Sequence, residues 1–333
     1  MRLGKIPENV LKRSVLKQMK NKRDEVINGA GVGEDCAIFS FDKENCAVSM
    51  APSMFEKSGS PEYAIHKAVN NLAAGGAFPV GVMLTVLLPE TISEAELKKM
   101  MTEAEETCRN LGIQLTGGHT EISNAVTRPV FIAAGIGKTQ KGKEIHTKGA
   151  IPGQELVITK WIGLEGTVIL AKERKEELLL KYPLHLVEEA EDFAQYLSVV
   201  PEAAAAVQSG AFVMHDASEG GIFGALWELA ENSGVGLEID FKKLPVKQET
   251  IEICEYFDLN PYELISGGCL LIVTDHGTDL VRTLEKQNIP AVVAGKITDN
   301  HDRVVIKDGE RRFLELPKPD EIYRVKGKGV IGE

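Results

Sequence analysis

Helical and extended segments alternate along this chain, and a loop rich in glycine, lysine and proline divides them into two halves. The loop covers residues 138–153. Amphipathic helices and apolar strands occur on both sides of it, which is typical of sheets with helices packed on one face. The sequence therefore predicts a two-domain α+β fold, with an N-terminal domain over residues 1–150, a C-terminal domain over 151–325 and a loose tail at 326–333.

Helix ends are marked most clearly in the first half. Pro61 opens one helix, which Gly75 and Gly76 stop, and Ser93 caps a second, in which Glu96 completes a capping box. The first half also predicts a helix over 7–25 and strands over 36–41, 46–50, 80–89, 113–122 and 128–138. The second half predicts strands over 154–160, 211–216, 264–275 and 289–299, helices over 165–180, 184–209 and 278–288, a helix begun by Ser218, and a closing hairpin.

The composition is that of an ordinary globular protein, with 43% apolar and 26% charged residues and a formal net charge of −11. An acidic chain lacks the basic face that nucleic acids and anionic membranes require, so neither is expected as a partner. No apolar run reaches membrane-spanning length, and the basic N-terminus lacks the apolar stretch of a secretory signal. Five scattered cysteines form no C-x-x-C pair, which argues against a zinc site or a disulfide framework. A soluble cytoplasmic protein is expected.

The stretch GAGVGEDCA places two glycines, Gly31 and Gly33, ahead of an acidic pair, Glu34 and Asp35. Glycines let backbone N–H groups converge on an anion. The carboxylates would repel a phosphate unless a divalent cation lay between them, and hard cations prefer oxygen ligands. The stretch lacks the P-loop spacing, and a strand rather than a helix follows it. Two interpretations stay open, a metal-assisted phosphate site and a tight turn with exposed acids.

The stretch LTGGHTE interrupts an apolar strand with Gly117 and Gly118 and then presents His119, Thr120 and Glu121. Glycines inside a strand often mark the close approach of a ligand or another backbone. Histidine and threonine can donate hydrogen bonds to a phosphate, and a glutamate can hold a metal or take a proton. The alternative interpretation is a bulge with polar residues at the edge of the sheet.

The stretch MHDASEGG places Asp216 at the end of an apolar strand and Ser218 at the start of a helix. A carboxylate in this place can contact a metal or a phosphate, or the two residues can simply cap the helix. Weaker candidates lie elsewhere. Glu165 in GLEGT marks either an anion-binding helix start or a plain one. Cys269 is predicted to be a buried thiol and His66 a surface histidine.

Taken in order, the motifs resemble those of the aminoimidazole-ribonucleotide synthetase-related (PurM-like) superfamily. They are GKIP, GVGEDCA, VNNLAAGGAFP, TGGHTE, RPV, GLEGT, HDASEGGIFGAL and ISGG, and they span residues 3–325. Their order makes this resemblance far more specific than any single motif. The chain looks most like the branch of the hydrogenase maturation factor HypE, which dehydrates a carbamoylated cysteine. It resembles the purine-pathway synthetase and the selenophosphate and thiamine-phosphate kinases more distantly.

The resemblance implies a homodimer in which the strands of the N-terminal domain form an intersubunit β-barrel. It also implies that ATP lies in a cleft near the dimer interface, that Mg²⁺ bridges its phosphates, and that phosphorylation activates an amide or carboxylate oxygen. By matching positions, Asp35 and Asp216 would hold the metal. The residues implied to lie against the nucleotide and substrate are Lys5, Gly31, Gly33, Gly117, Gly118, Thr120 and Gly220.

Three departures from the superfamily pattern bear on this chemistry. Ala51 stands where relatives carry an acid, and Asn71 stands where they carry a second acid. Alanine cannot ligate a metal and asparagine contributes no charge, so both metal binding and neutralisation of a transferring phosphoryl group should be weakened. The HypE branch ends in a reactive cysteine, whereas the last cysteine here is Cys269 and the chain ends VKGKGVIGE.

These observations predict a homodimeric ATP-dependent enzyme that acts on a small oxygen acid or amide. His119 would stabilise the transferring charge, and Glu121 would orient the substrate. The alternative is a non-catalytic nucleotide-binding or regulatory dimer with a degenerate metal site, which Ala51 and Asn71 favour. A third interpretation is a structural partner of another enzyme. A maturation partner protein would fit a HypE-like chain.

Overall fold

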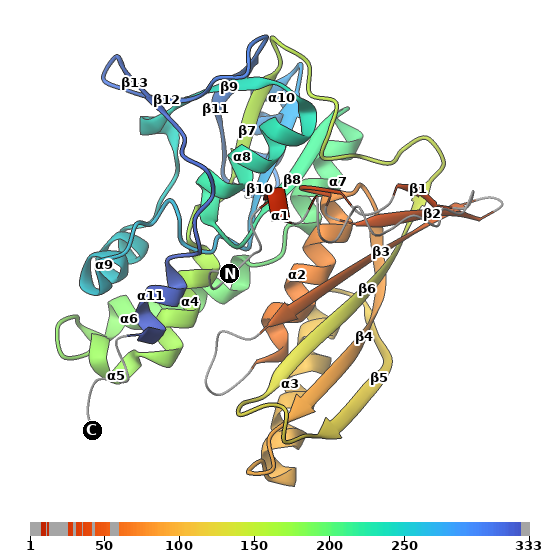
Figure 1. The fold of residues 1–333 in the computed structure, drawn as a ribbon, viewed down its shortest axis with the longest axis vertical. Coiled ribbons are helices and arrows are strands. Elements are labelled where there is room, and N and C mark those ends of the chain that lie inside the picture. Colours follow the sequence, from red (N-terminus) through yellow and green to blue (C-terminus); the bar gives the residue numbers. More distant parts are fainter. Residues whose placement is uncertain are drawn as a thin grey trace.

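The computed structural model describes residues 8–10, 12, 26–28, 31–34, 36–41, 44–53 and 60–327. Within these ranges the chain forms two α+β domains that lie side by side, each built on one sheet (Figure 1). The predicted two-domain α+β fold is therefore confirmed.

The N-terminal sheet has six strands in the order β1-β2-β3-β6-β4-β5. Helices α2 and α3 cover one of its faces (Figure 1). The elements of this domain are α1 Glu8–Val10, β1 Val26–Asn28, β2 Ala37–Phe41, β3 Glu44–Ser53, α2 Pro61–Ala74, β4 Phe78–Leu88, α3 Glu94–Asn110, β5 Gln114–Ile122 and β6 Val130–Gln140. Strand β5 runs parallel to β4 and lies at the edge of the sheet, and α3 provides the crossover that a parallel pair requires.

The opposite face of this sheet is apolar and exposed. Met50, Phe78, Val80 and Met83 have between 46% and 69% of their surface exposed. Along β3 and the start of β4, exposed residues alternate with buried ones, as expected of strands with one face in the core. An exposed apolar face of this kind is typical of an interaction surface.

The predicted starts of α2 and α3 are confirmed. Ser60 caps α2, because its side chain accepts a hydrogen bond from the Glu62 N–H over 3.2 Å. Pro61 lies in the first turn, where a helix needs no N–H donor. Ser93 and Glu96 form the predicted capping box. These local signals fix where α2 begins, and hence which of its residues face each domain.

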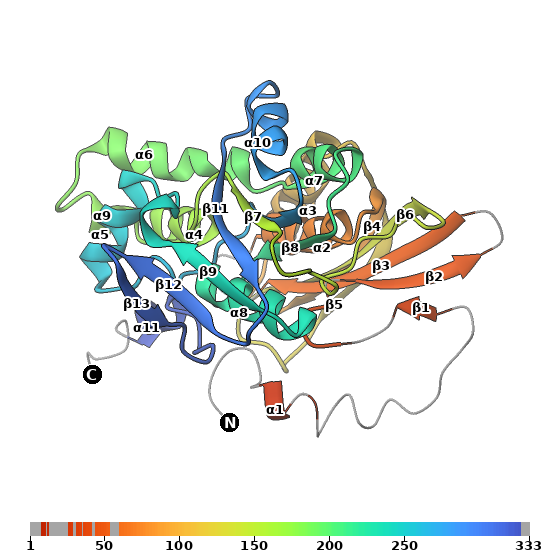
Figure 2. The ribbon, with the colours of Figure 1, turned by 90° about the horizontal axis from the view of Figure 1, so that it is seen from above.

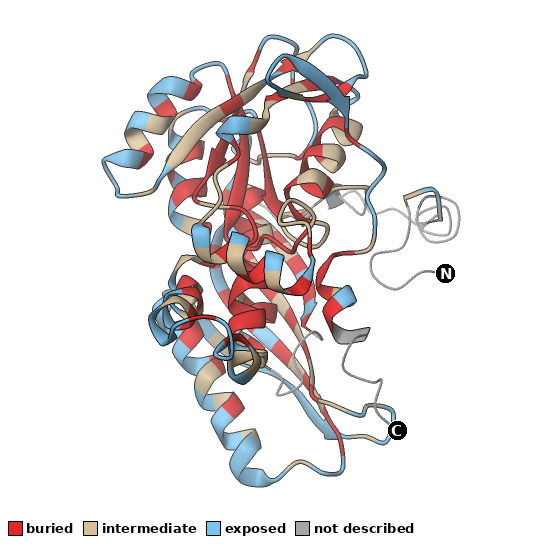
Figure 3. Cartoon of the chain, turned by 90° about the vertical axis from the view of Figure 1, so that its left-hand side faces the viewer, coloured by how far each residue is buried: buried red, intermediate tan, exposed pale blue. Residues whose placement is uncertain are grey.

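The C-terminal sheet has seven strands in the order β13-β12-β9-β11-β7-β10-β8, and β8 and β10 are buried along their whole length (Figure 3). The strands are β7 Glu155–Thr159, β8 Val213–Ala217, β9 Gly236–Asp240, β10 Cys269–Thr274, β11 Ala291–Thr298, β12 Arg303–Lys307 and β13 Glu310–Phe313. The helices are α4 Leu164–Glu173, α5 Lys175–Leu178, α6 Leu184–Asp192, η3 Phe193–Tyr196, α7 Val200–Gln208, α8 Gly221–Ser233, η4 Phe241–Lys243, α9 Gln248–Phe257, α10 Gly277–Glu285 and α11 Ile322–Gly327.

Helices pack on both faces of this second sheet, whereas helices on one face were expected. Helix α8 covers one face, and α7 and α10 cover the other. The physical reason is that β7 and β10 carry continuous apolar runs, so neither of their faces can be left in water, and β8 beside them is buried at every position.

Several local expectations differ from the structure. Helix α8 begins at Gly221, and Gly220 is its N-cap with a φ of 93°, so Ser218 does not cap it. Strand β10 begins only at Cys269, because Gly268 before it has a φ of 99°, which is not an extended conformation. Strand β9 and helix α9 were not predicted. The helix expected over 7–25 lies mostly outside the described residues, which include its segment Glu8–Val10.

The two domains share a hydrophobic cluster at the end of α2, where this helix of the first domain packs against the second. Ala73 and Ala74 of α2 pack with Val199 and Ala203 at the start of α7 and with Met214 of β8. Figure 2 shows α2 and α7 next to each other at this seam. Small side chains allow the two helices to approach closely.

A single buried amide adds hydrogen bonds to this seam. Asn70, which is 1% exposed, donates from Nδ2 to the carbonyl oxygen of Leu197 over 2.7 Å. Its Oδ1 accepts from the Val199 N–H over 2.9 Å. Helix α2 of the first domain thus satisfies two backbone groups of the second, which would otherwise be buried without partners.

We expect Asn70→Ala to lower the free energy of unfolding by about 2–4 kcal/mol, because it leaves a buried N–H and a buried C=O unsatisfied. Urea unfolding followed by circular dichroism measures this loss. The control is Asn110→Ala at the exposed end of α3. Equal effects of the two substitutions would show that the Asn70 bonds do not hold the seam together.

Candidate functional site

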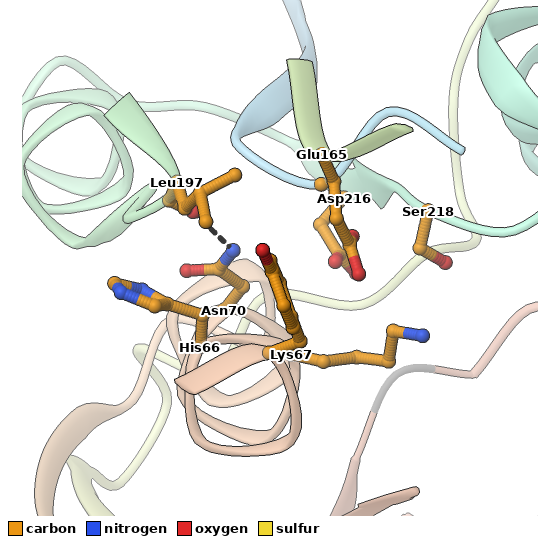
Figure 4. Close-up of a pocket in the computed structure, with 9 residues that line it drawn as sticks. His66, Lys67, Asn70, Glu165, Leu197, Asp216 and Ser218 are labelled. Atoms are coloured by element: carbon orange, nitrogen blue, oxygen red, sulfur yellow. Dashed lines mark hydrogen bonds between the residues drawn. The ribbon is translucent and has the colours of Figure 1, made fainter. Parts of the chain in front are cut away.

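A small pocket opens at the seam between the two domains (Figure 4). Helix α2 forms one wall, and the second domain forms the other with the start of α4, the end of β8 and the turn before β10. The residues that line it are Tyr63, His66, Lys67, Asn70, Glu165, Leu197, Asp216, Ser218 and Gly267. Of the predicted metal and catalytic residues that the structure describes, only Asp216 lies here.

His66 is half-buried in this wall, so its prediction as a surface histidine was wrong. Burial, helped by the positive charges of Lys160 and Lys172, lowers its pKa to about 4. Its Nδ1 is buried and has no hydrogen-bond partner among the residues that the structure describes. The imidazole is therefore neutral at pH 7, and it can donate or accept a hydrogen bond without adding charge to the pocket.

The loop that carries Leu197 is held in place by a buried ion pair. Lys160 Nζ lies 2.6 Å from Glu202 Oε1, and both side chains are at most 6% exposed. The same ammonium donates to the carbonyl oxygens of Tyr196, over 2.8 Å, and of Ser198. A buried charge is tolerated only when it is paired and hydrogen-bonded in this way. The pair fixes the loop against α2.

Two buried carboxylates, Glu165 and Asp216, form the wall opposite α2 (Figure 4). Glu165 lies in the first turn of α4 and is 4% exposed, and Asp216 near the end of β8 is 2% exposed. A Cβ atom at position 267 would lie 2.0 Å from Glu165 Oε2, so only glycine fits beneath this carboxylate. Glu165 was only a weak candidate in the sequence, because a helix start explains a glutamate equally well.

Asn71, one of the departures from the superfamily pattern, contacts Asp216 directly. The amide is placed with its oxygen toward the Ser49 hydroxyl, because the opposite placement would set that oxygen against Asp216 Oδ1. In this placement its nitrogen donates to Asp216 Oδ1 over 2.9 Å and to the carbonyl oxygen of Lys67 over 3.2 Å. Its amide oxygen accepts from Ser49 Oγ over 3.0 Å. This amide orientation satisfies every neighbour. Asn71 therefore links β3, α2 and β8 across the seam.

His119 and Glu121 lie away from the pocket, on the edge strand β5. His119 Nε2 is 3.2 Å from Glu121 Oε2, and more than half of each side chain is exposed. The strand is irregular here, with a register shift opposite Val82 and Met83 of β4. This geometry agrees with the bulge interpretation of LTGGHTE within one subunit.

The two glycines of LTGGHTE have unequal surroundings. Gly118 has a φ of 147°, and a Cβ atom there would lie 1.9 Å from the carbonyl oxygen of Leu84, so its close contact with β4 explains the glycine. Gly117 has a φ of 144°, and nothing lies within 4 Å of a Cβ atom at that position. Thr120 follows on the same exposed strand. The roles of Gly117, Gly118 and Thr120 at a nucleotide stay predictions.

The acidic turn GAGVGEDCA is described only in part. Glu34 accepts a hydrogen bond from Asn28 over 2.9 Å and lies 3.5 Å from Lys148 Nζ. Gly33 has a φ of 65° and packs beside Glu228 of α8. A Cβ atom on Gly31 would lie 2.7 Å from the Glu34 side chain. The structure thus agrees with a tight turn, although Glu34 is engaged rather than exposed.

Asp35 and Lys5 lie outside the described residues. The predicted pairing of Asp35 with Asp216 around Mg²⁺ therefore stays a prediction. Within the described part of the chain, no group of three His, Cys, Asp or Glu side chains is arranged to hold a metal. Asp216 faces an amide donor, which is a poor setting for a divalent cation because the donor occupies one carboxylate oxygen. The described residues do not fit Mg²⁺.

Gly220, predicted to contact the nucleotide, donates its N–H to Asp320 Oδ2 over 2.6 Å. The other oxygen of Asp320 accepts from the N–H groups of Ile265 and Ile322. Burial raises the pKa of this carboxyl to about 7, although the three N–H groups oppose the shift. Asp320 therefore caps α8 from 100 residues away in the sequence, which no local motif could reveal.

Cys269 is fully buried, and burial raises the pKa of its thiol to about 12. The prediction of a buried structural thiol is confirmed. None of the five cysteines, all of which the structure describes, forms a disulfide bond. Among the described residues, no helix is both long and apolar enough to cross a membrane.

The comparisons with known proteins agree with this geometry. The N-terminal domain of AIR synthase related proteins matches residues 33–139, and the C-terminal domain of the same family matches residues 152–308. This chain belongs to the AIR synthase-related family. The expected superfamily is thereby confirmed.

The relatives of this AIR synthase-related chain include hydrogenase maturation proteins. A hydrogenase expression/formation protein of Methanocaldococcus jannaschii is 26% identical, with 97% of each chain covered. Carbamoyl dehydratase HypE of Rhizobium leguminosarum bv. viciae is 27% identical over 70% of this chain and 65% of that relative.

Solved structures of HypE share the fold. The HypE–HypF complex matches with a TM-score of 0.73 at 22% identity, covering 86% of this chain and 94% of that chain. HypE in complex with ATP also matches with a TM-score of 0.73, at 18% identity, covering 95% and 96%. At this level of identity the likeness shows the fold alone.

The lowered pKa of His66 predicts that acid weakens this fold. Between its ordinary pKa of 6.5 and its folded value of about 4, the unfolded chain binds more protons at this residue than the folded chain. The free energy of unfolding should therefore fall as pH decreases through this window, by up to about 3 kcal/mol from this group.

Urea unfolding of the wild type and of His66→Gln at pH 7 and pH 5 measures this contribution. The wild type should lose more stability than the variant between the two pH values. His185→Gln, at an exposed histidine of α6, serves as the control and should behave like the wild type. Identical pH dependence in wild type and His66→Gln would contradict burial of a neutral imidazole.

Proposed function

We propose that this AIR synthase-related chain is a HypE-like, ATP-dependent protein that activates an amide or oxygen acid of a small substrate. The seam pocket, with a volume of about 230 Å³, would hold the phosphates of the nucleotide rather than the whole molecule. The observation that carries the proposal is the convergence of Lys67, Glu165, Asp216 and Ser218 from two domains on one pocket. Charged and hydroxyl groups gathered at a domain boundary are a usual setting for ligand binding. The structure of HypE in complex with ATP supports the choice of nucleotide.

The residues of the pocket have distinct chemical capacities in this proposal. Lys67 supplies a positive charge for phosphate oxygens, and Ser218 supplies a hydroxyl donor. Glu165 can accept a proton from a substrate amide or hydroxyl group. His66 is neutral and can donate or accept a hydrogen bond without adding to the charge.

A homodimer is part of the proposal, with the apolar face of the N-terminal sheet as its interface. His119, Thr120 and Glu121 lie on the exposed edge strand β5, outside the pocket of their own subunit. An intersubunit barrel would give this edge a partner strand, since exposed edges invite strand pairing. The three residues would then act at the dimer interface. A maturation partner protein is a further expectation, because HypE forms a complex with HypF.

A second candidate is a nucleotide-binding or regulatory dimer without catalysis. The specific observation in its favour is the hydrogen bond from Asn71 to Asp216, which engages a carboxylate that relatives would offer to a metal. Ala51 also favours this candidate, because its side chain is 2% exposed and lies in the apolar core. This candidate predicts ATP binding without phosphate release.

Isothermal titration of the purified protein with ATP, followed by a phosphate-release assay, tests both candidates. We expect ATP to bind, and Lys67→Met to weaken binding at least about tenfold by removing a charge-assisted hydrogen bond. Lys98→Met, at an exposed position of α3, is the matched control and should bind like the wild type. Absence of ATP binding to the wild type would refute nucleotide dependence, and binding without turnover would favour the second candidate.

Met83→Glu should break the proposed dimer, because it buries a charge in an apolar interface, which costs several kcal/mol. Size-exclusion chromatography with light scattering gives the mass of the wild type and of the variant. Leu180→Glu is the control, since Leu180 is 85% exposed but lies on the C-terminal domain. A monomeric wild type would contradict the dimer, and so would an unchanged mass of Met83→Glu.

A further inference from the structure

Helix α2 brings a lysine and an amide to the place where the superfamily pattern calls for metal chemistry. Lys67 and Asn71 are four residues apart, so they lie one turn apart on the same face of the helix. Both face the second domain, since Lys67 lines the seam pocket and Asn71 contacts Asp216. Neither residue was predicted to bind a ligand from the sequence.

The Asn71 amide is fully engaged in its surroundings. It donates to Asp216 and to the backbone of Lys67, and it accepts from Ser49. A carboxylate at this position would lie within hydrogen-bond distance of Asp216, and two carboxylates so close require a shared proton or a cation between them. An asparagine needs neither a shared proton nor a cation, because its amide donates a hydrogen bond to Asp216 where a second carboxylate would repel it.

Lys67 provides the positive charge on the same side of the pocket. Its side chain extends from α2 beneath Asp216 and Ser218 (Figure 4). The wall opposite α2 carries two buried carboxylates, Glu165 and Asp216, and a phosphate that entered beside them would need cationic compensation. An ammonium group can supply it, since lysine is a common phosphate-binding residue.

We propose that Lys67 and Asn71 together take the place of a divalent cation, so that this pocket binds the phosphates of a nucleotide without Mg²⁺. Lys67 neutralises the phosphate, and Asn71 holds Asp216 as a hydrogen-bond acceptor. This inference rests on the proposed nucleotide binding only for the role of Lys67. The role of Asn71 stands on the contact with Asp216 alone.

Thermal melting with magnesium or manganese chloride alone tests the role of Asn71, and no nucleotide is needed. The melting temperature of the wild type should not change, because the proposal leaves no cation site that would favour the folded state. Asn71→Asp should melt lower without metal and recover when either cation is added, because it creates a carboxylate pair with Asp216. Asn110→Asp on α3 is the control. Stabilisation of the wild type by either metal would overturn the inference, as would an Asn71→Asp variant that folds but does not respond.

Titration with ATP, once in EDTA and once in excess Mg²⁺, tests the role of Lys67. The wild type should bind ATP with affinities that differ by less than about threefold, since no metal bridge is lost in EDTA. Lys67→Met should lose at least about tenfold in EDTA and regain part of the loss with Mg²⁺, whereas Lys67→Arg should stay close to the wild type.

The outcomes separate the two proposals. Wild-type binding that requires Mg²⁺ would overturn the cation-free site while leaving nucleotide binding intact. No binding in either buffer would overturn the proposed function and the role of Lys67, and the melting experiment would still decide the role of Asn71. If the wild type and Lys67→Met bound ATP equally well in EDTA, the phosphates would have to bind at another part of the protein.

Discussion

The whole arrangement depends on α2, which belongs to the core of both domains at once. Its apolar side chains pack on the N-terminal sheet, while Ala73 and Ala74 pack on α7 and β8. Asn70 adds two buried hydrogen bonds to the loop before α7. Because one rigid helix carries Lys67, Asn70 and Asn71, the pocket is set by the packing of the domains. A shift of α2 would alter every one of these contacts together.

The electrostatic balance of the pocket follows from this packing. Glu165 and Asp216 are buried, and a buried carboxylate is stable only with hydrogen bonds or a cation nearby. His66 contributes no charge at neutral pH, since burial lowers its pKa. Asn71 contributes a hydrogen bond, and Lys67 on α2 contributes the charge. The second domain therefore carries negative charge at the seam, and the first domain supplies the positive charge and the hydrogen bond that offset it.

Local sequence signals predicted local structure well, and contacts across the seam poorly. The caps of α2 and α3 depend on residues a few positions apart, so the sequence contains them directly. Asp320 caps α8 across 100 residues, and only the folded chain brings them together. The order of motifs predicted the family and the fold. The burial of His66 could not be predicted, because it depends on the second domain packing against α2.

Ala51 and Asn71, the two departures from the pattern that the resemblance implies, have different physical surroundings. Ala51 lies in the apolar core between β3 and α2, so an acid there would have to be desolvated. Two residues earlier on the same face of β3, Ser49 donates to the amide of Asn71. Here the place of Ala51 is filled by core packing, and Asn71 is held by hydrogen bonds to Ser49 of β3, the backbone of α2 and Asp216 of β8, so Asn71 joins three elements.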